Sequence, residues 1–349
     1  MNNTLERKSF TAFEKDTLDV IKNWFAGRED FQFQTSGSTG APKTVTFSRQ
    51  QLIKSAKRSL NLFKLEQGDK ILLCLNPLFA AGFMTIVRAI EGNLDLIAIT
   101  PGANPLASLP GKISLDFAAF TPNQIEGILS KSPGKLMKVK TILIGGAGIH
   151  PELEKKLQNI QPDVFHSYAM TETLTHIACR SVNGPSKSLT FKAVRGVSFD
   201  TDKRSCLIVD DKTLGIKRLI TNDVVELLNN REFIWKGRID NVVNSGGIKI
   251  QIEQVESIIS QLLVDMNLEL KFCMISLPDK SLTNKLILLI EKGQYKYNQK
   301  SLEKTIRDKL PKYHAPKKIV EVPEIFQTNT GKVDRNRNAK LYLGTADEI

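Results

Sequence analysis

A stretch near the start of the chain combines hydroxyl groups, glycines and one lysine. Its members of these types are Thr35, Ser36, Gly37, Ser38, Thr39, Gly40 and Lys43. Hydroxyls and unhindered backbone N–H groups donate hydrogen bonds and a lysine adds positive charge, which is what binding of a phosphate chain requires. The alternating segment TVTFS follows, and Ser48 is placed to cap a helix after it. A flexible Ser/Gly linker needs neither the lysine nor the strand, so we interpret the stretch as a phosphate-binding loop.

Two common nucleotide motifs do not fit the sequence. Pro42 stands where a Walker P-loop has glycine before its lysine, and proline has no N–H to add to the cradle. The segment Gly145-Gly146-Ala147 follows an apolar run, but Pro151 occupies the last glycine position of a dinucleotide fingerprint. The loop is therefore a phosphate site of another design, and Gly145-Gly146-Ala147 is a strand end that a flat ring can approach.

Further segments with aromatic, acidic, basic or glycine residues follow in order. They are His166–Glu172, Ile220–Asp223, Gly237–Asp240, Asn244–Glu256 and Thr328–Arg335. Together with the first loop they resemble the motifs of the adenylate-forming enzymes, a family that includes acyl-CoA synthetases, luciferases and the adenylation domains of peptide synthetases. The resemblance spans residues 35–335. It implies that the first loop binds the pyrophosphate part of ATP and that Gly146 and Ala147 lie beside the adenine.

The resemblance also implies roles for single residues. Tyr168 would stack on adenine, Thr171 would contact the α-phosphate, and Glu172 would hold Mg²⁺. Asp223 would accept hydrogen bonds from the ribose hydroxyls, and Arg238 would lie beside the ribose and phosphate.

The last motifs imply a thiol substrate and a moving domain. Gly246 and Gly247 match the glycine loop of coenzyme A ligases, and Lys332 matches the lysine that bridges the acid and the α-phosphate. Asp240 would be the hinge. The expected catalytic residues are Lys332, Thr171 and Glu172, and the expected ligands are ATP, Mg²⁺, coenzyme A and a small carboxylic acid.

The chain departs from the family pattern at several positions. Ala169 and Asn222 replace glycines, and we expect Asn222 to keep a turn because asparagine tolerates positive φ. Ala80 stands where an aromatic or histidine gate often lies, so the acid pocket is atypical. Only 34 residues precede the phosphate loop, where the family has a long region. We therefore expect a truncated large domain.

The pattern of apolar and polar residues along the chain predicts the helices and strands that position these motifs. Apolar runs alternate with amphipathic stretches up to residue 146, which is typical of an α/β fold with a largely parallel sheet. Short strand-like segments after Val194 predict an antiparallel β region. After Asp240 the pattern changes to a glycine turn, two helices and strands between them. The expected architecture is an adenylate-forming fold, with a truncated large N-terminal α/β domain (1–239, including the β subdomain) and a small mobile α+β domain (240–349).

Composition limits the class of protein and its partners. The chain has 349 residues, 25% charged and 41% hydrophobic, which suits a soluble globular protein of two or three domains. The formal charge of +12 favours anionic partners. Basic residues are spread along the chain without an arginine-rich arm, so we expect no nucleic-acid partner. The first residues lack an apolar segment, and the four cysteines form no C-x-x-C pair. We therefore expect a cytoplasmic protein with reduced thiols and no membrane association.

Among coenzyme A ligases, the short N-terminal region, the Ser-Gly-Gly run and Ala80 most resemble the 2-succinylbenzoate:CoA ligases of menaquinone biosynthesis. That acid is a dicarboxylate, and Arg88, His176 and Arg180 are candidates to bind its second carboxylate. Three alternatives stay open: another aryl- or acyl-CoA ligase, an adenylation enzyme that loads a carrier protein, and a nucleotide-binding protein without catalysis. The oligomeric state is not predicted by the sequence.

Overall fold

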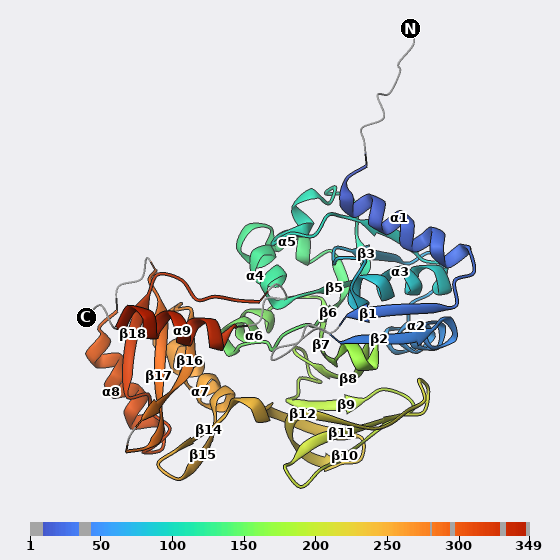
Figure 1. The fold of residues 1–349 in the computed structure, drawn as a ribbon. Helices are drawn as coiled ribbons and strands as arrows, with labels where there is room; N and C mark the ends of the chain where they lie inside the picture. The colour runs from blue at the N-terminus through green and yellow to red at the C-terminus, as the bar shows by residue number, and fades with distance from the viewer. Residues whose placement is uncertain (1–9, 35–42, 280, 294–296, 329–332, 347–349) are drawn as a thin grey trace. The chain divides into compact units, whose positions relative to one another are not determined.

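The computed structural model (Figure 1) describes residues 10–34, 43–279, 281–293, 297–328 and 333–346. Contacts between residues divide the chain into two compact units. The first comprises residues 1–146, 158–198 and 210–217, and the second comprises residues 147–157, 199–209 and 218–349. The predicted domain boundary at residue 240 stays a prediction.

A mostly parallel sheet forms the centre of the first unit (Figure 1). Its strands are β3 (Lys70–Leu73), β4 (Asp95–Ala98), β5 (Leu115–Phe120), β6 (Val139–Ile144), β7 (Asp163–Ala169), β8 (His176–Ser181) and β9 (Thr190–Ala193). They lie in the order β9-β8-β7-β6-β5-β3-β4. The pairs from β4 to β7 are parallel, whereas β8 is antiparallel to both β7 and β9. The predicted α/β fold with a largely parallel sheet is confirmed.

Several helices of the first unit begin at side chains that bind their first turn. The helices are α1 (Ala12–Phe25), α2 (Arg49–Phe63), α3 (Ala80–Gly92), α4 (Pro122–Lys131), α5 (Pro133–Leu136), and the short 3-10 helices η1 (Pro105–Ser108) and η2 (Thr171–Thr173). Ser48 caps α2 as predicted, because its Oγ accepts from Gln51 N at 3.3 Å while Gln51 Oε1 accepts from Ser48 N at 2.9 Å. Thr11 and Thr121 form the same reciprocal box at α1 and α4.

An aromatic cluster holds the hairpin that flanks the predicted phosphate loop. Strands β1 (Asp30–Gln34) and β2 (Thr44–Ser48) pair antiparallel, with Gln34 opposite Thr44. Phe31 and Phe33 of β1 are buried, and their rings lie 5.1 and 5.2 Å from that of Phe83 on α3. Edge contacts of this kind add to the free energy gained by burial. The strand that precedes the 35–42 segment is therefore anchored on α3.

The second unit contains an antiparallel ribbon, as predicted for the region after Val194. Strands β10 (Val197–Thr201), β11 (Cys206–Asp211), β12 (Ile216–Asn229) and β13 (Glu232–Arg238) follow one another in the chain. β12 and β13 pair antiparallel with Asp223 opposite Arg238, and the register shifts between Val224 and Val225.

The C-terminal part of the second unit is the predicted α+β arrangement. Its elements are η3 (Ile239–Asn241), β14 (Val242–Ser245), β15 (Ile248–Gln251), α7 (Ile252–Asp265), β16 (Phe272–Asp279), β17 (Thr283–Glu291), α8 (Gln299–Lys309), β18 (Lys318–Val322) and α9 (Arg335–Ala346), and the short α6 (Pro151–Leu157) also belongs to the unit. Strands β16, β17 and β18 form one sheet. Alternate residues of β16 separate its two faces: Met274 packs in the cluster that contains α7 and α8 side chains, whereas Cys273 and Ile275 pack in the cluster that α9 joins.

Two expectations from composition concern thiols and membrane spans. All four cysteines are free thiols, and Cys74, Cys206 and Cys273 are buried. No helix within the described ranges has the length and apolar character to cross a bilayer.

A buried ion pair in the first unit joins α2 to Asp211, the last residue of β11. Arg58 Nη1 donates to Asp211 Oδ2 at 2.7 Å, and these side chains are 5% and 0% exposed. Asp211 Oδ1 also accepts from the backbone N–H groups of Thr213 and Leu214, at 2.9 and 3.2 Å. Arg58 keeps two guanidinium nitrogens, Nε and Nη2, without a hydrogen-bond partner in the described part of the chain.

This geometry predicts the effect of removing the negative charge alone. Asp211→Asn keeps an oxygen for the two backbone donors but leaves Arg58 buried without compensation, so the free energy of unfolding should fall by about 3 kcal/mol. Urea denaturation followed by circular dichroism measures the loss. The double variant Arg58→Met/Asp211→Asn should regain most of it, and a single variant within about 0.5 kcal/mol of the parent would contradict the interpretation.

Candidate functional site

The predicted site residues of the first unit lie at one edge of its sheet. Phe120 of β5 is opposite Ile144 of β6, and Ile144 is opposite His166 of β7. Because the three strands are parallel, the segments that follow them leave the sheet at the same edge: Gly145-Gly146 after β6 and Met170–Glu172 after β7. Ligands of open α/β sheets bind beyond this carboxyl edge. The structure thus brings Gly146, Tyr168, Thr171 and Glu172 to a common edge.

The backbone after β6 is packed too closely for side chains. Gly145 N donates to Phe120 O at 3.0 Å, and a Cβ on Gly145 would lie 2.6 Å from Ser167 Oγ. Ser167 Oγ in turn donates to Ile144 O at 3.1 Å. Gly146 has φ +86°, which a residue with a side chain rarely adopts. The result is a bare backbone surface of the kind that a planar ring can contact.

Tyr168, Thr171 and Glu172 are held by the end of β7 and the turn after it. The Tyr168 ring is partly buried and lies 6.0 Å from that of Phe191. The buried Thr173 hydroxyl donates to Met170 O at 3.0 Å and accepts from Met170 N at 3.2 Å, which closes η2 and fixes the two residues between them. Ala169, where the family has glycine, is the last residue of the regular strand.

The surroundings of Glu172 fit a magnesium ion that substrate phosphates help to bind. The carboxylate is partly exposed. A search of the described residues finds no group of three or more histidine, cysteine, aspartate or glutamate side chains that could bind a metal alone. Mg²⁺ is commonly bound through one or two carboxylates plus nucleotide phosphates and water. One carboxylate at the edge where a triphosphate is expected is therefore a suitable donor set.

In the second unit the structure brings Asp223 and Arg238 together. Asp223 is buried, and Arg238 Nη1 lies 3.8 Å from its Oδ1. Trp235 Nε1 donates to the same Oδ1 at 3.1 Å and holds the carboxylate in one orientation. The sequence did not indicate Trp235, because the register shift in the β12–β13 pairing, which skips Lys236 of β13, has no local signal.

Asn222 does not form the turn that we expected. It lies within the 14 residues of β12, and its Nδ2 is 3.3 and 3.4 Å from the two carboxylate oxygens of Asp240. Arg238 Nη2 donates to Asp240 Oδ2 at 2.7 Å. A side-chain amide at this position thus gives the predicted hinge residue a second partner that glycine cannot provide.

Gly246 and Gly247 form the tip of the hairpin between β14 and β15. Their φ values are +59° and +81°, and a two-residue hairpin of type I′ needs positive φ at both positions. A Cβ on Gly246 would lie 3.0 Å from Tyr313 Cδ1, so the backbone passes directly over this aromatic ring. Tyr313 is a further site candidate that sequence reasoning missed.

Several predicted residues lie outside the described residues. They are Thr35, Ser36, Gly37, Ser38, Thr39, Gly40 and Lys332. Lys43 is described and exposed at the start of β2, and Ala147 begins the 147–157 segment of the second unit. The roles assigned to these residues stay predictions.

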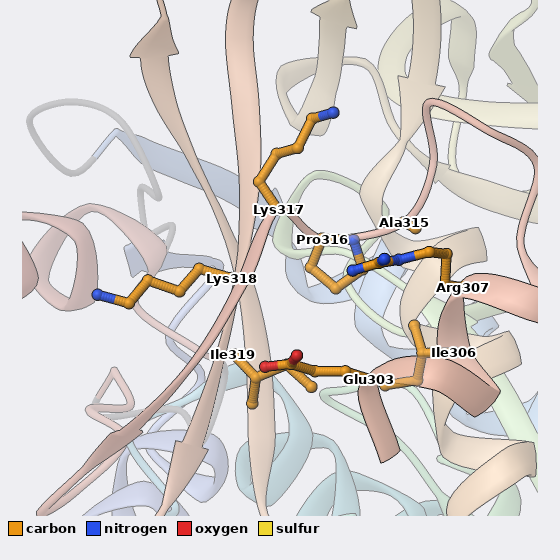
Figure 2. Close-up of a pocket in the computed structure, with 8 residues that line it drawn as sticks. All are labelled: Glu303, Ile306, Arg307, Ala315, Pro316, Lys317, Lys318 and Ile319. Carbon is orange, nitrogen blue, oxygen red and sulfur yellow. The ribbon is translucent and has the colours of Figure 1, made fainter. Parts of the chain in front are cut away.

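A pocket in the second unit lies apart from the predicted residues. It is formed between α8 and the segment that leads into β18, and Figure 2 shows Lys317 and Lys318 pointing in different directions from that segment. Its lining comprises Glu303, Ile306, Arg307, Ala315, Pro316, Lys317, Lys318 and Ile319. None of the residues that the sequence assigned to ATP, acid or thiol binding lines it.

A buried cationic cluster, defined here as Arg58, Arg88 and His176, lies in the first unit. Arg88 on α3 is 3% exposed, and burial lowers its pKa to about 10 despite a small opposing effect of Cys179. Its Nε has no hydrogen-bond partner among the described residues, and no carboxylate in those ranges forms an ion pair with it. A buried guanidinium without a counter-ion is costly.

His176 contributes a neutral group to the cluster. Burial, and then the charges of Arg88 and Arg58, hold its pKa well below the ordinary 6.5. Its Nε2 lies 3.2 Å from Ser59 Oγ. Arg180, which the sequence grouped with Arg88 and His176, instead donates to His166 Nδ1 at 3.3 Å and to Ser188 O at 3.1 Å.

Comparisons with known proteins show what the whole chain resembles. A model of the AMP-binding enzyme family matches residues 32–218. A 2-succinylbenzoate–CoA ligase of Haemophilus influenzae is 27% identical over 280 residues, which cover 72% of this chain and 59% of that protein. The chain therefore spans about three fifths of that relative's length.

Solved structures extend the similarity to nearly the whole chain. An acyl-CoA synthetase (AMP-forming)/AMP-acid ligase II-like protein of Dyadobacter fermentans is 33% identical, with a TM-score of 0.63 and coverage of 96% of both chains. The o-succinylbenzoate coenzyme A synthetase of Bacillus subtilis, solved with ATP and magnesium ion, is 18% identical with a TM-score of 0.72. It covers 88% of this chain and 69% of that one, and its likeness concerns the fold.

The depressed pKa of His176 predicts a loss of stability in mild acid. Below its ordinary pKa of 6.5 the unfolded chain binds a proton that the folded chain does not, so stability falls as pH falls. Between pH 6.5 and 5.5 the wild type should lose about 1 kcal/mol more than His176→Gln. Urea denaturation at both pH values measures the difference. An equal loss in the wild type and in His176→Gln would contradict the prediction.

Proposed function

Because the chain belongs to the AMP-binding enzyme family, we propose that it is an ATP-dependent acid:CoA ligase that forms an acyl adenylate and then an acyl-CoA thioester. The observation that carries this proposal is the common placement of Gly146, Tyr168, Thr171 and Glu172 at the carboxyl edge of the parallel sheet. A chain that only bound nucleotide would show no acid-dependent pyrophosphate exchange.

The first step activates the acid. A carboxylate is a poor electrophile because its leaving group would be oxide. When a carboxylate oxygen attacks the α-phosphorus of ATP, the bond from that phosphorus to the bridging oxygen breaks, and pyrophosphate leaves with the bond's electrons. The product carries AMP as a good leaving group. Two anions must approach each other, so this chain's task is to position them and neutralise charge, for which we propose Lys43 and Lys332.

Several of the described residues would bind a particular part of ATP in this step. The bare backbone at Gly146 and the ring of Tyr168 would bind the adenine, and Thr171 would donate to the α-phosphate. Asp223, oriented by Trp235, would accept from the ribose hydroxyls. When bound, Mg²⁺ at Glu172 would neutralise phosphate charge.

The second step forms the thioester. The sulfur of coenzyme A attacks the carbonyl carbon of the adenylate, the bond from that carbon to the phosphate oxygen breaks, and AMP leaves while the thiol proton passes to solvent. We assign the pantetheine contact to the Gly246-Gly247 hairpin. At Gly247 the space that a Cβ would occupy is open, whereas the backbone of Gly246 lies against Tyr313. Between the two steps, rotation of the small C-terminal domain about Asp240 would withdraw Lys332 from the reacting groups and bring this hairpin to the pantetheine.

The buried cationic cluster supports a dicarboxylic acid as substrate, and we propose 2-succinylbenzoate. Arg88 lacks an acidic partner in the described part of the chain, and Arg58 has only one for its three nitrogens. A second carboxylate would supply the missing counter-charge to Arg88 through charge-assisted hydrogen bonds. A neutral His176 beside it supplies no counter-charge to the guanidinium groups.

One assay tests the proposed activity. ATP–pyrophosphate exchange should depend on an added acid, with 2-succinylbenzoate faster than benzoate or a medium-chain fatty acid, and addition of coenzyme A should yield a thioester detected by mass. Faster turnover of the fatty acid would reject the dicarboxylate assignment. Exchange without a CoA thioester, but with transfer to a phosphopantetheinyl protein, would identify a carrier-loading enzyme.

Lys332→Ala should separate the two steps. The variant loses charge neutralisation in adenylation, so acid-dependent exchange should fall by about 10²- to 10³-fold. Thioester formation from supplied acyl adenylate and coenzyme A should change by less than about three-fold. Both rates are measured on the same preparation, and equal losses in the two steps would contradict a role confined to adenylation.

Arg88→Leu should change which acid is preferred. Loss of a charge-assisted contact should lower kcat/KM for 2-succinylbenzoate by about 10- to 100-fold, whereas benzoate, which has no second carboxylate, should change little. The ratio of the two kcat/KM values on one preparation corrects for partial unfolding. An unchanged ratio would place the second carboxylate elsewhere.

A further inference from the structure

The segment that carries Lys332 leaves and rejoins the fold at one tightly bonded point. Gln327 and Val333 form an isolated antiparallel bridge. Asp334 N then donates to Phe326 O at 3.0 Å. The residues on the two sides of the 328–332 segment are therefore paired backbone to backbone.

A single buried side chain binds both sides of this base. Asn338, on the first turn of α9, is 3% exposed. Its Oδ1 accepts from Phe326 N at 3.0 Å, and its Nδ2 donates to Phe326 O at 2.9 Å and to Asp334 O at 2.8 Å. The amide thus acts as a clamp that extends the short bridge. No other type of side chain of this length both accepts and donates in this way.

The clamp is in turn fixed to the body of the second unit. Arg335, the last residue of the same motif, forms a two-point ion pair with Glu256 of α7, with both N–O distances 2.6 Å. Arg335 Nη1 also donates to Met274 O of β16 at 2.8 Å, and Glu256 Oε1 accepts from Met274 N at 2.7 Å. Paired hydrogen bonds of this kind define orientation as well as distance. The start of α9 is therefore attached to both the sheet and α7.

We propose that Asn338 is a positioning residue for Lys332: by closing the base of the loop on a helix start that Arg335 and Glu256 fix, it sets where the lysine is presented. The inference rests on the proposed function, in which Lys332 neutralises charge in adenylation. A displacement of about 1 Å at a reacting centre can cost about 10²-fold in rate.

The test compares Asn338→Ala with Asn298→Ala in the full-length chain. The side-chain amide of Asn298 also bonds to the backbone: its Oδ1 accepts from Ser301 N at 3.1 Å at the start of α8. Asn298→Ala therefore removes a comparable hydrogen bond from the same unit and serves as the control. Asn338→Ala should lower kcat for acid-dependent ATP–pyrophosphate exchange by about 10- to 100-fold, with KM for ATP within about two-fold. Thioester formation from supplied adenylate should stay within about two-fold, and Asn298→Ala should affect neither step.

A double variant separates positioning from a structural role. If Asn338 acts through Lys332, Lys332→Ala/Asn338→Ala should exchange pyrophosphate no more slowly than Lys332→Ala alone. Tm is measured throughout, and Asn338→Ser serves as a second variant if Asn338→Ala does not fold. Three outcomes would overturn this inference and leave the proposed function standing. They are additive losses of exchange in the double variant, equal losses in adenylation and thioester formation, and wild-type exchange in a folded Asn338 variant. Absence of exchange in the wild type would overturn the proposed function with it.

Discussion

Parallel pairing of β5, β6 and β7 is the constraint on which the proposed site depends. Because these strands run in one direction, Gly145-Gly146 and the Met170–Glu172 turn leave the sheet at the same edge, although they are distant in the chain. Packing then fixes the local detail. Ser167 lies where a side chain on Gly145 would be, and Thr173 closes the turn that carries Glu172. Strand direction therefore determines which segments meet at this edge, and individual side chains then determine how those segments are held.

The sequence predicted those features that depend on local patterns. Alternating apolar and amphipathic segments indicated the parallel sheet, and the types and order of the motif residues indicated the nucleotide edge. Features that arise from distant pairing could not be predicted. Trp235 meets Asp223 where the pairing of β12 with β13 skips Lys236, and Asn222 lies in a strand because β12 continues through it to pair with β13. Asn338 had no signal of its own, since its three partners are backbone groups.

Buried charge is treated in two ways in this fold. Arg335 lies against Glu256 with both partners satisfied, so that pair can serve as a fixed attachment for α9. Arg58 and Arg88 are buried with nitrogens that have no partner in the described ranges. Such a cluster is stable only while the rest of the unit offsets its desolvation. This difference is consistent with a structural role for Arg335 and with the proposed role of Arg88 in binding an anionic substrate.

The two tryptophans give each unit its own optical reporter. Trp24 is buried in the aromatic cluster of the first unit, whereas Trp235 bonds the carboxylate of Asp223 in the second. An indole whose N–H is bound to a charged oxygen emits according to that oxygen's other contacts. In a Trp24→Phe chain, the emission of Trp235 would therefore test the proposed contact of Asp223 with ribose, without a label or a coupled assay.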